Sequence, residues 1–352
     1  MMTKEAETET LYALAGRVIR RYIKVYLEMA RTTKGFTDVK QTDLLNFERR
    51  VIVLGGISSP LDPAGVSPDR VAEEWLRMQA VPFEVEQAIT KGVYIELRQR
   101  VEVLVKELEQ ATASFMEFAP DYISDHPHFL PVLQRLADIP SKAELKRRIG
   151  SVSDNAVSIS AAERLAEILN QRQPGRAITR AQLLQSIEPT LEGIIRDLLV
   201  GRVLLESIVV NALDDAEIPY KRESEYEALN GVVYDFRADF VIPDEHNPQA
   251  FIEVRKSSTR HASLYAKDKM FSAINWKGKN RELLAVLVVD GPWTSATLRV
   301  MAKVFDYIVS INRVPDVVEV ISAYINGDRS KLKWLIDFSI HPANPESETG
   351  AA

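Results

Sequence analysis

The chain has 352 residues, of which 46% are hydrophobic and 27% are charged, a composition typical of globular proteins and sufficient for one large domain or two ordinary ones. It has no cysteine, which excludes disulfides, zinc ribbons and thiol nucleophiles and favours a reducing, cytoplasmic setting. The net charge of -6 argues against a non-specific polycation, and since no apolar run is long enough to cross a bilayer, we expect no membrane partner.

The N-terminal half has a helical pattern. Apolar residues recur with helical periodicity from about residue 7 to about residue 213. Segments rich in Pro and Gly interrupt the pattern at 54–70, 119–128 and 172–176 and are expected to be connections. The sequence therefore predicts a large all-helical region over residues 1–186.

The pattern changes after a long helix that is expected to start near residue 187. Short segments rich in Val and Ile and bounded by turn residues, which is typical of strands, follow at 231–242, 250–257, 282–291 and 317–322. A helical stretch over 262–275 lies between the second and the third segment. This order predicts an α/β (α+β) core over 187–339, with a mixed central sheet flanked by helices, and a disordered polar tail over 340–352.

Two acidic residues stand inside the first two strand-like runs. Turn-forming residues separate Asp239 in the first run from Glu253 in the second, which predicts a hairpin that brings the two side chains together. Two neighbouring carboxylates raise each other's pKa unless a divalent ion neutralises both. Because oxygen ligands favour a hard ion, we predict that Asp239 and Glu253 bind Mg²⁺.

The spacing of Asp239, Glu253 and Arg255, with a helix before them and a helix and a strand after them, resembles the PD-(D/E)xK nuclease superfamily, best known from type II restriction endonucleases. The resemblance covers about residues 215 to 310 and implies a restriction-endonuclease-like core. It implies that Asp239 and Glu253 are the metal ligands, and Glu206 on the preceding helix is a weaker match for an assisting acid.

The sequence departs from the family pattern two residues after the glutamate. Arg255 stands where the family has the lysine that orients or activates the attacking water, and Lys256 is one place further on. An arginine stays charged and is a poor proton acceptor. Three alternatives follow: Arg255 acts as an electrostatic stabiliser, a bulge or a lysine of the next helix (Lys267 or Lys269) supplies the amine, or the site binds DNA without cutting it.

The segment from Arg255 to Arg281 is strongly basic. It holds eight lysines and arginines and one acid, Asp268, in a chain whose total charge is negative. Because clustered cations neutralise phosphates, we expect this segment to bind double-stranded DNA, with its hydroxyls as further phosphate contacts. The predicted DNA-binding residues are Ser257, Ser258, Arg260, His261, Lys267, Lys269, Lys277 and Lys279.

Together these features predict a cytoplasmic, Mg²⁺-dependent double-strand DNA endonuclease, most similar to a type II restriction enzyme, that hydrolyses phosphodiester bonds. The predicted catalytic residues are Asp239, Glu253, Arg255, Lys256 and Glu206. The alternatives are a non-catalytic DNA-binding protein that retains a degenerate nuclease fold, and a repair or junction-resolving nuclease.

The helical region over 1–186 is expected to serve DNA recognition, dimerisation or both. A long helix predicted over 83–118 is the candidate dimerisation element. A homodimer is expected because two-fold symmetry suits an enzyme that cuts both strands of a palindrome.

Overall fold

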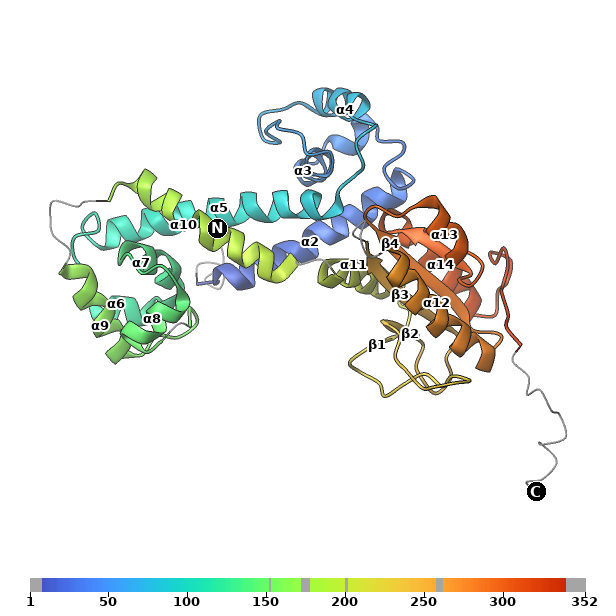
Figure 1. Ribbon diagram of the computed structural model, residues 1–352. Coiled ribbons are helices and arrows are strands. Elements are labelled where there is room, and N and C mark those ends of the chain that lie inside the picture. The colour runs from blue at the N-terminus through green and yellow to red at the C-terminus, as the bar shows by residue number, and fades with distance from the viewer. Residues whose placement is uncertain (1–7, 152, 172–177, 200–201, 258–261, 340–352) are drawn as a thin grey trace, which may run out of the picture. The chain divides into compact units, whose positions relative to one another are not determined.

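The computed structural model describes residues 8–151, 153–171, 178–199, 202–257 and 262–339 (Figure 1). These residues form thirteen α-helices, a few short 3₁₀ turns and one five-stranded mixed sheet. The chain divides into two compact units. Unit 1 comprises Met1–Tyr22 and Asn46–Val200, and unit 2 comprises Ile23–Leu45 and Gly201–Ala352.

All regular elements in the described part of unit 1 are helices. Helix α2 (Leu11–Thr32) begins in this unit, and the others are α3 (Phe47–Gly56), α4 (Pro68–Arg77), α5 (Val85–Ala111), α6 (Pro120–Asp125), α7 (Leu130–Leu136), α8 (Lys142–Ile149), α9 (Ile159–Asn170) and α10 (Arg180–Leu199). Local sequence explains several of the starts. Ser67, Ser141 and Ser158 each accept a backbone hydrogen bond as the N-cap of the helix that follows.

The helix predicted over 83–118 is α5, and its apolar stripe forms much of the core of unit 1. Its buried residues include Ile89, Val93, Leu97, Val101, Leu104 and Leu108, which recur with helical spacing. Helix α3 packs closely against α5, because a Cβ at Gly55 would stand 2.8 Å from the Cα of Ala88. The predicted boundary at 186/187 falls inside α10, which continues without a break to Leu199.

Unit 2 contains the sheet. Its elements after residue 201 are α11 (Arg202–Asp215), β1 (Lys221–Arg222), β2 (Phe240–Ile242), β3 (Ala250–Lys256), α12 (Ala262–Lys279), β4 (Leu284–Asp290), α13 (Ser295–Met301), β5 (Tyr307–Ser310) and α14 (Val314–Ile325). The strands lie in sequence order. Strands β1, β2 and β3 pair antiparallel, whereas β3, β4 and β5 pair parallel, so the sheet is mixed, as predicted.

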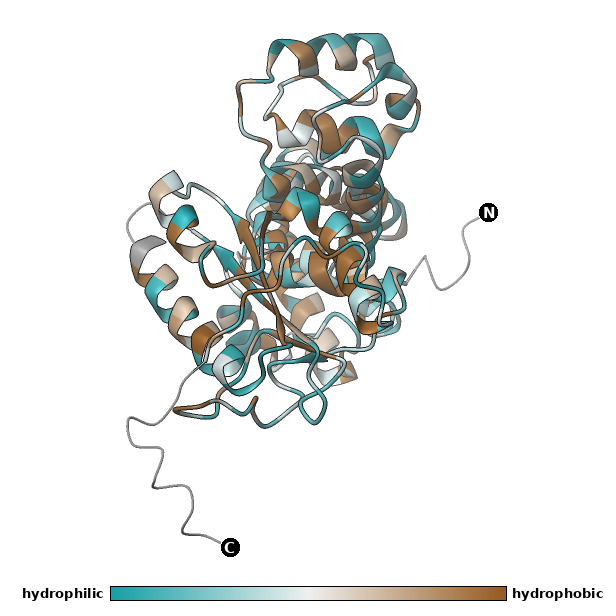
Figure 2. Ribbon diagram, turned by 90° about the vertical axis from the view of Figure 1, so that its right-hand side faces the viewer, coloured by the Kyte–Doolittle hydropathy of each residue, from teal (hydrophilic) through white to brown (hydrophobic). Residues whose placement is uncertain are grey.

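Helices cover the sheet of unit 2. On the face that carries Phe251, α12 supplies Trp276, whose ring meets that of Phe251 edge-on with centroids 4.9 Å apart. Leu287 and Phe305 complete this part of the core. Most residues of β3 and β4 are buried, and Figure 2 shows hydrophobic colour on strands of the sheet.

The predicted strands differ from the structure in three ways. Of the run 231–242, only Phe240–Ile242 forms a strand, β2, so Asp239 lies just before it. The run 317–322 lies inside helix α14, and the last strand is instead β5 at Tyr307–Ser310. A short apolar run fits a buried strand and a buried helix equally well, and here Pro315 at the first turn of the helix decides for the helix. No helix in the described ranges is long and apolar enough to span a membrane.

Candidate functional site

The two acids meet on the β2–β3 hairpin. Phe240 pairs with Ile252, and the same register places Asp239, directly before β2, opposite Glu253. The backbone N–H of Glu223 donates to the carbonyl of Asp239 at 3.0 Å, which extends the β1–β2 pairing to this residue. Opposite residues in an antiparallel pair project from the same face. The two carboxylates therefore share one face of the sheet, and both side chains are buried.

The guanidinium of Arg255 joins the two acids. Its Nη1 donates to Oδ2 of Asp239 at 2.9 Å and to the carbonyl of Val254 at 2.6 Å. Its Nη2 lies 3.4 Å from Oε2 of Glu253. Oδ2 of Asp239 also accepts the backbone N–H of Val254 at 2.7 Å. Arg255 lies two residues after Glu253 on β3, so both side chains point to the same face.

A lysine from α12 completes the cluster. Nζ of Lys269 lies 2.9 Å from Oε2 of Glu253, and the side chain is 8% exposed. Ala266, Lys269, Ala273 and Trp276 are all buried and recur with helical spacing, so Lys269 lies in the apolar stripe that faces the sheet. A cation in such a stripe requires a buried acid opposite it. That pattern is the sequence signal that separates Lys269 from the exposed Lys267.

Glu253 is the electrostatic centre of the cluster. Burial, and then the charge of Asp239, raise the pKa of Glu253 to about 8, against the lowering effect of Lys269 and Arg255. Oε1 of Glu253 is buried and has no hydrogen-bond partner among the described residues. A buried carboxylate oxygen without a partner is costly, and a further cation would relieve this cost.

These residues fit a hard divalent ion. Mg²⁺ is typically held by one or two carboxylates together with waters and phosphate oxygens. Asp239, Glu253 and the carbonyl of Val254 would supply the protein oxygens. In the described parts of the chain, no group of three or more His, Asp or Glu residues is placed to hold a metal, so an ion here would have two acidic ligands.

Glu206 reaches the same region from α11. It lines a cavity of about 380 Å³ together with Arg222, Glu223, Ser224, Arg237 and Asp239. Nη2 of Arg222 donates to Oε2 of Glu206 at 3.4 Å. The cavity therefore brings Glu206 and Asp239 to one hollow that also contains two arginines.

The remaining predicted site residues are placed differently. Lys256 is half-buried and, by strand alternation, points to the face opposite Arg255. Ser257 is buried, and its backbone N–H donates to the carbonyl of Asp290 at 2.9 Å. Lys267 and Lys279 are exposed on α12. The predicted contacts Ser258, Arg260 and His261 lie outside the described residues.

Lys277 is a core residue, which is at odds with the predicted phosphate contact. Its side chain is fully buried, and Nζ lies 2.6 Å from Oδ2 of Asp306 and 2.9 Å from the carbonyl of Leu283. The same carboxylate oxygen accepts the N–H of Ala285 at 2.7 Å. Lys277 lies eight residues after Lys269, on the same side of α12, so helical phase directs it toward the sheet.

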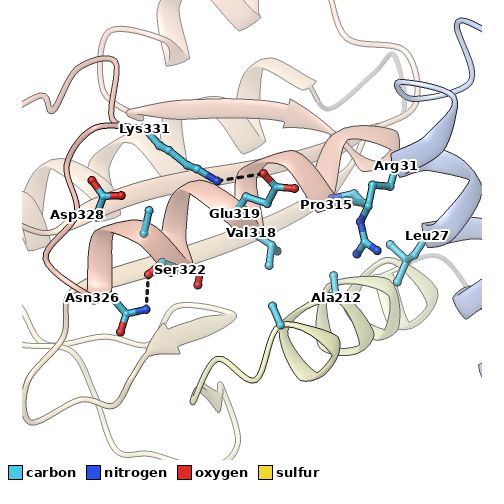
Figure 3. Close-up of a pocket in the computed structure, with 12 residues that line it drawn as sticks. Leu27, Arg31, Ala212, Pro315, Val318, Glu319, Ser322, Asn326, Asp328 and Lys331 are labelled. Carbon is cyan, nitrogen blue, oxygen red and sulfur yellow. Dashed lines mark hydrogen bonds and ion pairs between the residues drawn. The ribbon is translucent and has the colours of Figure 1, made fainter.

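A second cavity in unit 2 was not predicted. It has a volume of about 490 Å³ and is lined by the end of α2, by α11, by α14 and by the residues that follow α14. Figure 3 shows Arg31 beside Pro315 and the ion pair of Lys331 with Glu319, whose Nζ and Oε2 are 3.3 Å apart. The cavity shares no lining residue with the hollow at Asp239. Small residues such as Ala212 and Ser322 leave this space open, and their sequence carries no ligand motif.

Comparisons of the chain with models of protein families, with curated proteins and with solved structures each find no match.

Proposed function

We propose that the protein is a Mg²⁺-dependent endonuclease that hydrolyses phosphodiester bonds of double-stranded DNA, with the cluster of Asp239, Glu253, Arg255 and Lys269 as its active site. The observation that carries the proposal is the meeting of two buried acids on one hairpin, where Oε1 of Glu253 has no hydrogen-bond partner among the described residues. The order α11, β2 with Asp239 directly before it, β3 with Glu253, α12 and β4 also agrees with the order that the resemblance to PD-(D/E)xK nucleases implies.

The side chains of the cluster suit distinct roles. Asp239 and Glu253 would hold the ion, which when bound neutralises phosphate charge and makes water a better nucleophile. Lys269 holds Glu253 in place and would supply the amine that the family's lysine provides. Arg255 supplies a permanent positive charge for the phosphate, but it accepts no proton. Among the three alternatives for the missing lysine, the geometry favours a shared role for Arg255 and Lys269.

The surroundings suit a polyanionic substrate. Arg222 and Arg237 line the hollow beside Asp239, and Lys267 and Lys279 are exposed on α12. Clustered cations of this kind neutralise phosphates irrespective of base sequence. Sequence recognition and a homodimer, as in a type II restriction enzyme, are part of the proposal and would be roles of unit 1.

Incubation of the purified chain with phage DNA and Mg²⁺ tests the proposal. We expect discrete fragments. Asp239→Asn and Glu253→Gln should abolish cutting but retain DNA binding in Ca²⁺, whereas the control Glu227→Gln, which removes an exposed acid of the same unit, should cut normally. Normal cutting by the Asp239 and Glu253 variants would remove these residues from the mechanism, and a smear would indicate a repair-type nuclease.

One observation favours a second candidate, a DNA-binding protein that does not cut. Arg255 already donates to Asp239 and to the carbonyl of Val254, two of the oxygens that an ion would need. If Arg255 always occupies the place of the ion, the protein would bind DNA through its lysines and arginines but would not cut it. This candidate predicts salt-sensitive DNA binding and intact DNA with every divalent metal.

A further inference from the structure

We propose that Arg255 is an exchangeable counter-ion: its guanidinium holds the two acids together in the metal-free protein and withdraws when a divalent ion binds there. The inference rests on the proposed function, because it concerns the same pair of acids. It assigns Arg255 a positioning role that the lysine of the family pattern does not have.

The contacts of Arg255 coincide with those an ion would make. The guanidinium lies against Oδ2 of Asp239, the carbonyl of Val254 and Oε2 of Glu253. Two of these oxygens belong to the carboxylates of the acids, and the third is the backbone carbonyl of the residue between Glu253 and Arg255. An ion bound to both carboxylates therefore competes with Arg255 for the same oxygens.

Charge balance indicates that ion and guanidinium exchange places. An ion binds the acids in their ionised form, and in that form the cluster of Asp239, Glu253, Arg255 and Lys269 has no net formal charge. A divalent ion added to it would leave two uncompensated positive charges in a largely buried space, which is costly. Withdrawal of Arg255 leaves a single positive charge, and one phosphodiester group neutralises that charge.

The side chains differ in their freedom to leave. Arg255 lies next to the end of β3 and its side chain is 15% exposed, whereas that of Lys269 is 8% exposed and is anchored in the apolar stripe of α12. Among the described residues, Lys269 forms its ion pair in this cluster with Glu253, so it can stay in place while Arg255 moves toward solvent. A withdrawn guanidinium would face the DNA phosphate. Ion loading and substrate binding would thereby favour each other.

Binding of Mn²⁺, measured by electron paramagnetic resonance on the full chain without DNA, tests the exchange. Mn²⁺ stands in for Mg²⁺ because it prefers the same octahedral oxygen ligands. We expect Arg255→Gln to bind Mn²⁺ at least tenfold more tightly than the unmodified chain. Arg255→Lys should fall between the two, since a lysine keeps the charge but makes fewer simultaneous contacts.

The matched control is Arg237→Gln, which removes the same charge beside the same hollow. Arg237 donates to the carbonyl of Glu223, so its loss should raise Mn²⁺ affinity far less than the loss of Arg255. Glu253→Gln should lose the bound Mn²⁺. Circular dichroism confirms that each variant is folded, and Arg255→Lys keeps the test decisive if Arg255→Gln does not fold.

The outcomes separate the two proposals. Equal or weaker Mn²⁺ binding by Arg255→Gln and Arg255→Lys, together with loss of binding in Glu253→Gln, would overturn the exchange and leave the metal site standing. Two other outcomes would overturn the metal site and the exchange with it. In one, neither the unmodified chain nor the Arg255 variants bind Mn²⁺; in the other, Glu253→Gln binds Mn²⁺ as tightly as the unmodified chain.

Discussion

Nζ of Lys269 and Oε2 of Glu253 lie 2.9 Å apart inside unit 2, and the glutamate side chain is fully buried. Above about pH 8, where Glu253 is ionised, removal of Lys269 leaves the charge of this buried carboxylate uncompensated and costs about 3–5 kcal/mol of folding stability. We therefore expect Lys269→Met, above this pH, to unfold at clearly lower urea concentration than the unmodified chain and to lose DNA cleavage.

The neighbouring lysine provides the control for this prediction. Lys267 is exposed on the same helix, so Lys267→Met should change the unfolding midpoint little and lower DNA affinity only slightly. Similar losses of stability in the Lys267 and Lys269 variants would mean that the pair with Glu253 contributes nothing particular.

The raised pKa of Glu253 predicts a pH dependence of stability. Burial and Asp239 raise this pKa to about 8, so between about pH 5 and pH 8 the folded chain retains a proton that the unfolded chain has lost. The contribution of Glu253 to the free energy of unfolding therefore falls as pH rises through this window. Urea denaturation in EDTA at several pH values should show a steeper decline for the unmodified chain than for Glu253→Gln. Parallel curves for the two proteins would contradict the prediction.

The sequence was sufficient to predict the acid pair but not its surroundings. Two apolar runs with turn residues between them indicate the hairpin. In the structure, the register of its strands places Asp239 opposite Glu253. The partners of these acids were harder to predict, because Lys269 and Lys277 stand on a helix whose rotation toward the sheet decides which cations are buried. The composition of the basic segment gives its net charge, but it does not distinguish a buried lysine from an exposed one.

Because Lys277 forms a buried ion pair with Asp306, we expect its substitution to lower the stability of the fold without weakening DNA binding. Both side chains are fully buried, and the main cause of the lowered pKa of Lys277 is this burial. Lys277→Met should destabilise unit 2 by about 3 kcal/mol, since it leaves Asp306 without its cation. The folded variant should bind DNA as tightly as the unmodified chain, whereas Lys279→Met, at an exposed position, should weaken salt-sensitive binding. Weaker DNA binding by folded Lys277→Met, as measured by gel shift, would restore the original phosphate-contact prediction.

Substitution of Gly291, which follows β4, should strain the backbone close to the site. Its φ is +81°, and an added Cβ would stand 2.6 Å from the carbonyl oxygen of Ser257, directly after β3. Gly327 has a φ of +79° and no atom within 4 Å of such a Cβ. Both alanine variants adopt a left-handed conformation at a cost of about 1–2 kcal/mol, but Gly291→Ala must also displace the backbone of Ser257. Urea denaturation should therefore show a larger loss for Gly291→Ala than for Gly327→Ala, and only Gly291→Ala should slow cleavage. Equal losses would mean that the strand end adjusts to the added methyl group without cost.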